Sequence, residues 1–178
     1  MSDRRHPPRG AEAGSSRGRV GKIRRTVEEY IREARQSIWD LRSPRLAQSD
    51  LPKALRQAGE RAIGERPVAL DFTVTGTPHR CAPVVEEHLL HIGQEAVSNA
   101  VQHGRATRVG MEIAYDDNQT RLRVSDDGCG FDPVTLNGAN GHYGLISMRE
   151  RAEQVKGRVR IDSAPGRGTL VEAVVPTV

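Results

Sequence analysis

Aromatic residues are scarce in this chain of 178 residues: Phe, Trp and Tyr together make up 3% of it, against 36% for all hydrophobic residues. A hydrophobic core must therefore be built mainly from Val, Leu, Ile and Ala. Only two cysteines occur, Cys81 and Cys129, and they do not share a CxxC spacing. This argues against a disulfide framework or a CxxC metal site, and it favours a reducing compartment.

Long apolar runs are also missing. No stretch approaches the roughly 20 apolar residues that span a bilayer, and no apolar signal-peptide core follows Met1. The chain lacks the GxxxxGK[ST] loop of P-loop nucleotide-binding proteins and the HRD motif of protein kinases. We therefore expect a cytoplasmic domain without a membrane segment, and one that uses neither of these two designs.

Positive charge is concentrated at the start of the chain. Residues 1–25 contain eight basic and two acidic residues, so the net charge of +4 arises there and the remainder carries −2. A basic tail can contact nucleic acid or an anionic membrane. Its content of Pro, Gly and Ser instead favours a disordered tail over residues 1–25, and we expect no specific nucleic-acid site.

Hydrophobic periodicity predicts helices that cluster and strands that pair locally. An amphipathic helix is expected over residues 26–43, where apolar residues recur every three or four positions up to Pro44. The other expected elements are a helix at 50–64 with Asp50 as its N-cap, a strand at 68–76, a long helix at 82–104, two strands within 107–128, a helix at 145–157 and a hairpin at 158–176. This order predicts an α+β fold, a two-layer α/β sandwich with helices on one face of a mixed sheet, and disfavours a Rossmann fold.

The long predicted helix contains "QEAVSNAVQHG", residues 94–104, in which Glu95, Asn99 and His103 recur every four residues. At 100° per residue the three side chains fall within about 80° of one another, at the margin between the apolar face and solvent. An ordinary polar border is one interpretation. Small neighbours, among them Ala96 and Ala100, favour another, in which a ligand lies against the helix.

A second motif, "VSDDGCGF" at residues 124–131, follows a predicted strand. The carboxylate of Asp126 at the strand end can accept a hydrogen bond from a ligand amino group. Gly128 and Gly130 permit positive φ and let another group approach the backbone closely. A simple turn after a strand is the alternative interpretation.

Two further glycine-containing motifs follow. In "NGANGHYGLISMRER", residues 137–151, Gly138, Gly141 and Gly144 precede a helix, whose first backbone N–H groups can bind an anion. A surface loop is the alternative there, although its length over residues 131–143 is typical of a functional lid. The fourth motif, "APGRGT" at residues 164–169, predicts a hairpin turn.

In this order and spacing the four motifs resemble the N, G1, G2 and G3 boxes of the Bergerat-fold ATPases. That family contains histidine kinases, gyrase-type topoisomerases, MutL and heat-shock chaperones of the ninety-kilodalton class. The segment from 141 to 169, and "SIWDLRSP" at 37–44, look like bacterial sensor histidine kinases of the nitrate-sensor class. The resemblance implies the second helix of a dimerisation domain at residues 26–45 and an ATP-binding catalytic domain at residues 46–178.

The resemblance also implies a role for each motif residue. Asn99 would coordinate Mg²⁺, Glu95 would orient or deprotonate a water or the incoming nucleophile, and His103 would approach the phosphates of ATP. Asp126 would accept a hydrogen bond from the adenine amino group. The remaining motif residues would shape the base pocket or bind phosphate through backbone N–H groups: Gly128, Gly130, Gly141, Gly144, Gly168 and Thr169.

A histidine kinase needs a histidine to phosphorylate, and none of the six histidines lies in a context like "REIHD". The first hypothesis is thus an ATP phosphotransferase that acts on a histidine supplied by a partner kinase or a missing segment, within a response-regulator pathway. A nucleotide-binding interaction module without transfer is the second, and an anti-sigma-type serine kinase is a weaker third. The apolar stripe of residues 26–43 would form a homodimer or dock to a partner kinase.

Overall fold

The computed structural model describes residues 50–132 and 143–177. The predicted tail at 1–25, the predicted helix at 26–45 and most of the predicted lid at 131–143 lie outside these residues. The described elements, in chain order, are α2 (Leu51–Ile63), β1 (Ala69–Gly76), α3 (Pro83–Gln102), β2 (Arg108–Tyr115), β3 (Gln119–Asp126), α4 (Tyr143–Gln154), β4 (Arg158–Ser163) and β5 (Thr169–Pro176).

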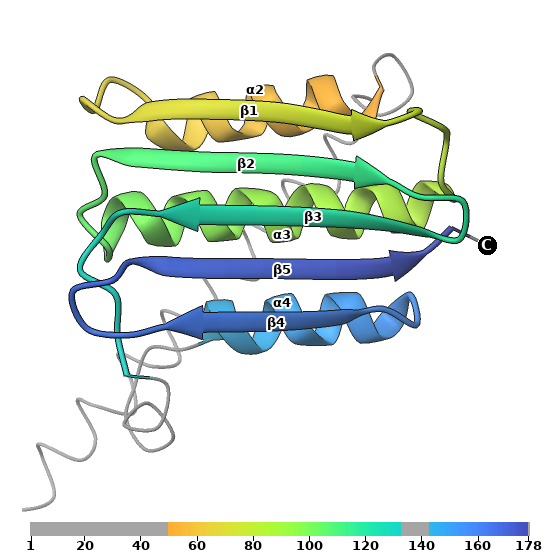
Figure 1. Ribbon diagram of the computed structural model, residues 1–178. Helices are drawn as coiled ribbons and strands as arrows, with labels where there is room; N and C mark the ends of the chain where they lie inside the picture. The colour runs from red at the N-terminus through yellow and green to blue at the C-terminus, as the bar shows by residue number, and fades with distance from the viewer. Residues whose placement is uncertain (1–49, 133–142, 178) are drawn as a thin grey trace, which may run out of the picture. The chain divides into compact units, whose positions relative to one another are not determined.

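The strands form one mixed sheet in the order β1-β2-β3-β5-β4 (Figure 1). β1 and β2 are parallel, because α3 lies between them in the chain and returns it to the same edge. The other neighbouring pairs are antiparallel. β3 and β5 are adjacent although about fifty residues separate them in sequence, and the register pairs Val124 with Val171.

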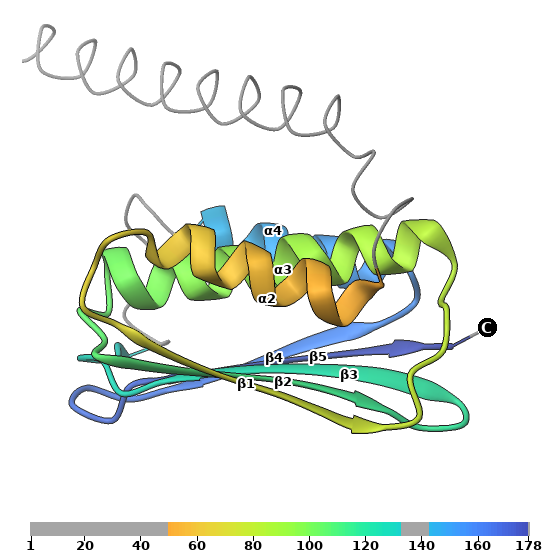
Figure 2. The ribbon, with the colours of Figure 1, turned by 90° about the horizontal axis from the view of Figure 1, so that it is seen from above.

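All three described helices cover the same face of the sheet (Figure 2). The prediction of an α+β two-layer sandwich is therefore confirmed. The opposite face carries the alternate, more exposed residues of β2, β3 and β4, as expected for a sheet packed on one side only. None of the helices in the described part of the chain is long and apolar enough to cross a bilayer.

The core is aliphatic, as the shortage of aromatic residues requires. The centre of the core lies where α3 packs against both α2 and the middle strands of the sheet. Gly93 makes this approach possible, because a Cβ at that position would lie 2.8 Å from Cδ2 of Leu55 on α2 and 3.3 Å from Cδ2 of Leu122 on β3. The second half of α3 faces the end of β3 and the start of β5 across the cavity described below.

Both ends of α2 follow the capping rules, and the end of α3 departs from them. Asp50 caps α2, since its Oδ1 accepts a hydrogen bond from the Lys53 backbone N–H at 3.1 Å. At the end of α3, however, the left-handed residue is not Gly104 but Arg105, with φ of 53°. The Gly104 N–H instead bonds to the Asn99 carbonyl at 2.9 Å. The helix ends in this way where the chain meets the segment after β3, and the Gly104 carbonyl accepts a hydrogen bond from the Cys129 N–H.

Candidate functional site

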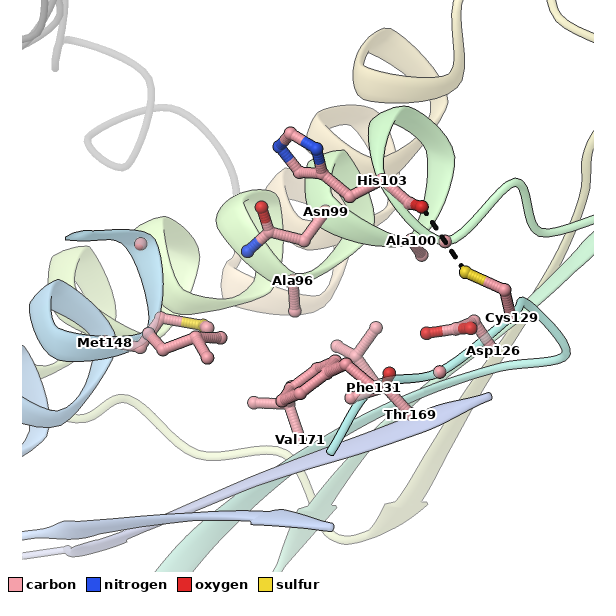
Figure 3. Close-up of a pocket in the computed structure, with 15 residues that line it drawn as sticks. Ala96, Asn99, Ala100, His103, Asp126, Cys129, Phe131, Met148, Thr169 and Val171 are labelled. Carbon is pink, nitrogen blue, oxygen red and sulfur yellow. Dashed lines mark hydrogen bonds between the residues drawn. The ribbon is translucent and has the colours of Figure 1, made fainter. Parts of the chain in front are cut away.

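A cavity of about 330 Å³ opens between the C-terminal half of α3, the first turns of α4 and the sheet (Figure 3). This volume lies within the range of small-molecule binding pockets, roughly 300–1,000 Å³. The residues that line it are Ala96, Asn99, Ala100, His103, Gly104, Val124, Asp126, Cys129, Gly130, Phe131, Gly144, Leu145, Met148, Thr169 and Val171. The cavity therefore gathers residues of all four motifs.

One end of the cavity is polar and is built on α3. The side-chain nitrogen of Asn99 donates a hydrogen bond to Oε1 of Glu95, one turn earlier, at 3.3 Å. Because its nitrogen is held by Glu95, the amide turns its oxygen to other partners. Gly144 at the start of α4 packs on this pair: a Cβ there would overlap Glu95 Oε1 and would lie 3.3 Å from Asn99 Nδ2.

The carboxylate of Asp126 lies on another wall of the cavity and points into it (Figure 3). Its Oδ1 accepts a hydrogen bond from the Gly128 backbone N–H at 2.8 Å. Burial raises the pKa of Asp126, and the backbone hydrogen bonds from Gly128 and Thr169 oppose this rise. A partly desolvated carboxylate favours a ligand that offers it a hydrogen-bond donor.

Apolar side chains form the walls between these polar groups. Ala96 and Ala100 of α3 are almost fully buried and face Val171 of the sheet across the cavity, which Val124 of the sheet also lines. Because the two alanine side chains are small, they leave space for a ligand beside α3, as the sequence predicts. Met148 of α4 closes one side. A flat, largely apolar ring with an amino substituent fits walls of this kind.

The backbone after β3 is pinned between two other segments. The Cys129 N–H donates to the Gly104 carbonyl at 2.7 Å, and the Gly166 N–H donates to the Cys129 carbonyl at 2.7 Å. Gly130 has φ of 57° and Gly168 has φ of 66°, a conformation that other L residues rarely adopt. Glycine is therefore needed where the second and fourth motifs cross.

The structure brings most of the predicted site residues together. The cavity is lined by six of them: Asn99, His103, Asp126, Gly130, Gly144 and Thr169. Three more lie beside lining residues, since Glu95 bonds to Asn99, Gly128 bonds to Asp126, and a Cβ on Gly168 would overlap the Asp126 backbone carbonyl. Gly141 lies outside the described residues.

No role was expected for two apolar residues of the lining, Phe131 and Met148, or for the polar residue Asp127, although all three lie within the motifs. Phe131 and Met148 line the cavity, and the position of Phe131 directly after Gly130 was the available signal. Asp127, the neighbour of Asp126, accepts hydrogen bonds from the Thr107 hydroxyl at 2.6 Å and from the Thr107 and Arg108 backbone N–H groups at 2.7 and 2.9 Å. These bonds, that from the Thr107 hydroxyl first, lower the pKa of Asp127 to about 2.

Comparison with known proteins gives consistent relatives. The chain is 34% identical over 160 residues to the nitrate/nitrite sensor protein NarX of Escherichia coli K12, which covers 88% of this chain and 26% of NarX. It is 30% identical over 158 residues to the sensor histidine kinase LiaS of Bacillus subtilis, covering 89% of this chain and 43% of LiaS. The chain thus spans less than half the length of these relatives.

Solved structures share the fold. The blue-light activated histidine kinase of Erythrobacter litoralis EL346 matches with a TM-score of 0.62 at 19% identity, over 72% of this chain and 42% of that protein. The mycobacterial sensor histidine kinase MprB matches with a TM-score of 0.56 at 21% identity, over 72% and 95%. The family model described as histidine kinase-, DNA gyrase B-, and HSP90-like ATPase matches residues 84–178, more than half of the chain. The chain therefore belongs to this ATPase family.

Proposed function

We propose that the cavity binds Mg·ATP and that the domain transfers the γ-phosphate to a histidine supplied by a partner kinase or by another segment of a longer protein. The observation that carries the proposal is the arrangement of Asp126 and Asn99. The Asp126 carboxylate and the Asn99 amide line one cavity with apolar walls between them, and Glu95 is hydrogen-bonded to Asn99. ATP has the matching sequence of groups: an aminopurine ring, then a ribose and a chain of phosphates.

The adenine ring would lie between the alanines of α3 and the valines of the sheet. Its exocyclic amino group would donate to the Asp126 carboxylate, whose Oδ1 is already oriented by Gly128. Because the carboxylate is half-buried, a ligand without a donor would leave its remaining acceptor positions without a partner, which costs binding free energy. We expect the base selectivity of the domain to depend on this contact.

The phosphates would lie toward Asn99, His103 and Gly144. Mg²⁺ fits this end, because it takes oxygen ligands and is commonly held by one or two protein groups together with substrate phosphates. The hydrogen bond from Asn99 Nδ2 to Glu95 leaves Oδ1 as the amide atom that can ligate the ion. When bound, Mg²⁺ would neutralise phosphate charge.

Glu95 is suited to act on the incoming nucleophile. Its carboxylate is hydrogen-bonded to Asn99 and packed beside Gly144, so its position relative to the phosphate end is defined. It would orient the acceptor imidazole or accept its proton at a carboxylate oxygen. Phosphoryl transfer depends mainly on such positioning and on charge stabilisation.

The relatives suggest the setting of this reaction. NarX and LiaS are named as sensor proteins and LiaS as a histidine kinase, so we propose a cytoplasmic two-component pathway with a response regulator as the final acceptor. Residues 26–43 would pair with a second copy or with a partner kinase to present the acceptor histidine.

The test is incubation with γ-labelled ATP, first of the chain alone and then with an acceptor fragment that carries the first dimerisation helix of a relative. We expect no label on the chain alone and acid-labile, base-stable label on the fragment. Glu95→Gln should abolish the label while ATP still binds. Binding without transfer to any acceptor would favour the interaction-module hypothesis, label on serine would favour an anti-sigma-type kinase, and absence of ATP binding would refute all three.

A further inference from the structure

In addition to the backbone pairing of β2 and β3, the side chain of Asp127 joins the end of β3 to the start of β2. Oδ1 of Asp127 accepts the backbone N–H groups of Thr107 and Arg108 at 2.7 and 2.9 Å. Oδ2 accepts the Thr107 hydroxyl at 2.6 Å. The Asp127 backbone N–H donates in turn to the Arg108 carbonyl at 3.3 Å. Both carboxylate oxygens and the backbone of Asp127 are thus bonded to the same two residues.

These hydrogen bonds of Asp127 orient the neighbouring carboxylate, that of Asp126. Successive side chains along a strand point to opposite sides, and the bond from the Asp127 N–H to the Arg108 carbonyl continues the pairing one residue beyond the end of β3. Asp127 is exposed where it meets Thr107. With Asp127 held on that side, Asp126 projects to the other side, into the cavity. A rotation that released Asp127 would also turn Asp126 away from the cavity and from the Gly128 N–H.

The Asp127 bonds are also the first of several hydrogen bonds that hold the segment after β3. Gly128 bonds to Asp126 at 2.8 Å, and the Cys129 N–H bonds to the Gly104 carbonyl at 2.7 Å. Two residues further on, the Phe131 N–H donates to Ser163 Oγ at 2.9 Å. The later bonds fix the segment that runs past the cavity, whereas Asp127 fixes the peptide that follows Asp126 directly.

We propose that Asp127, together with Thr107, is a positioning residue that holds the Asp126 carboxylate toward the cavity and thereby sets the selectivity of the site for nucleotides with an amino group on the purine ring. This inference rests on the proposed function. The low pKa of Asp127 supports it, since the anchor stays ionised at every pH at which the protein is expected to work.

The experiment compares the affinity of ATP with that of purine riboside triphosphate, the analogue that lacks the 6-amino group. In Asp127→Ala the ratio of the two affinities should fall by about tenfold, the loss expected when one charged hydrogen bond is misaligned. Asp127→Asn should largely restore the ratio, because its amide oxygen can still accept the two backbone N–H groups. A purely structural contact would lower the folded fraction without changing this ratio.

Thr107→Val is the second variant, and it tests the positioning role of the Asp127 bonds if Asp127→Ala does not fold. It removes only the hydroxyl bond and should lower the ratio in the same direction by a smaller factor. Asp71→Ala is the matched control: Asp71 is an exposed carboxylate that pairs with Arg108 at 3.0 Å, and its loss should leave the ratio unchanged. An unchanged ratio in every Asp127 and Thr107 variant that folds would overturn this inference alone. A wild-type chain that does not bind ATP would overturn the proposed function with it.

Discussion

The side-chain nitrogen of Asn99 is hydrogen-bonded to Oε1 of Glu95 at 3.3 Å, so two consecutive turns of α3 act as one polar unit. The bond orients both groups: the amide presents its oxygen and the carboxylate is held beside Gly144. In the proposed function the first group ligates Mg²⁺ and the second acts on the nucleophile. Removing either member should therefore affect a different part of the reaction.

Asn99→Ala should abolish the dependence of ATP binding on Mg²⁺ and leave the fold intact. Asn99 lies at the margin of the core, so its truncation removes a ligand and creates little cavity. The measurement is a calorimetric titration with ATP in the presence and absence of Mg²⁺. Gln102→Ala, an exposed amide on the same helix, is the control and should behave as wild type. An unchanged Mg·ATP affinity in Asn99→Ala would refute the metal-ligand role.

Asp126→Asn should weaken ATP binding by roughly ten- to a hundred-fold, the value of a buried hydrogen bond to a charged group. The amide can turn its own donor toward the adenine amino group, whereas the carboxylate only accepts. GTP, which lacks an amino group at that ring position, should lose much less. Equal losses for the two nucleotides in a competition assay would show that Asp126 does not recognise the base.

The same residue predicts a pH dependence of binding. Burial raises the pKa of Asp126 above its ordinary value of 3.8, so the carboxylate becomes protonated, and a weaker hydrogen-bond acceptor, at a higher pH than an exposed Asp would. ATP affinity should therefore fall as the pH is lowered through this raised pKa. In Asp126→Asn, which does not titrate, this decline should be absent.

For Asp127 we expect a pH effect on stability rather than on binding. Its folded-state pKa of about 2 lies below the ordinary 3.8, so its contribution to stability is present above about pH 4 and is lost as the pH falls toward 2. Urea unfolding midpoints of wild type and Asp127→Asn, measured across this window, should converge as the pH falls. A difference that stays constant over the window would contradict the assignment of these bonds.

Gly144→Ala should slow phosphotransfer and leave the base selectivity unchanged. The added Cβ would overlap Oε1 of Glu95 and displace its carboxylate, while Asp126 lies on another wall of the cavity. Loss of a positioned general base lowers rates by about a hundredfold or more. The measurement is transfer to the acceptor fragment at saturating ATP. Arg149→Ala, at an exposed position on α4, is the control, and an equal rate in both variants would argue against a role for Glu95.

Much of the fold could be predicted because its signals are local. The alternation of "VALDFTVTG", the periodicity of residues 82–104 and the hairpin at 158–176 each depend on neighbours within one element, and the structure has all three. Helix capping by Asp50 was equally local. The end of α3 was not local: capping rules favour a left-handed glycine there, yet Arg105 rather than Gly104 has this conformation, and the Gly104 carbonyl accepts a hydrogen bond from the distant Cys129 N–H.

The sequence by itself determined which residue types the site contains, since four spaced motifs hold the amide, the carboxylates and the glycines. Only the tertiary structure decided which of the two adjacent aspartates, Asp126 and Asp127, faces the cavity. Asp126 faces the cavity and Asp127 faces Thr107, because the register of β2 and β3 and the packing of α3 above them choose the side on which each side chain lies. Those contacts join residues about twenty positions apart, which no local pattern encodes.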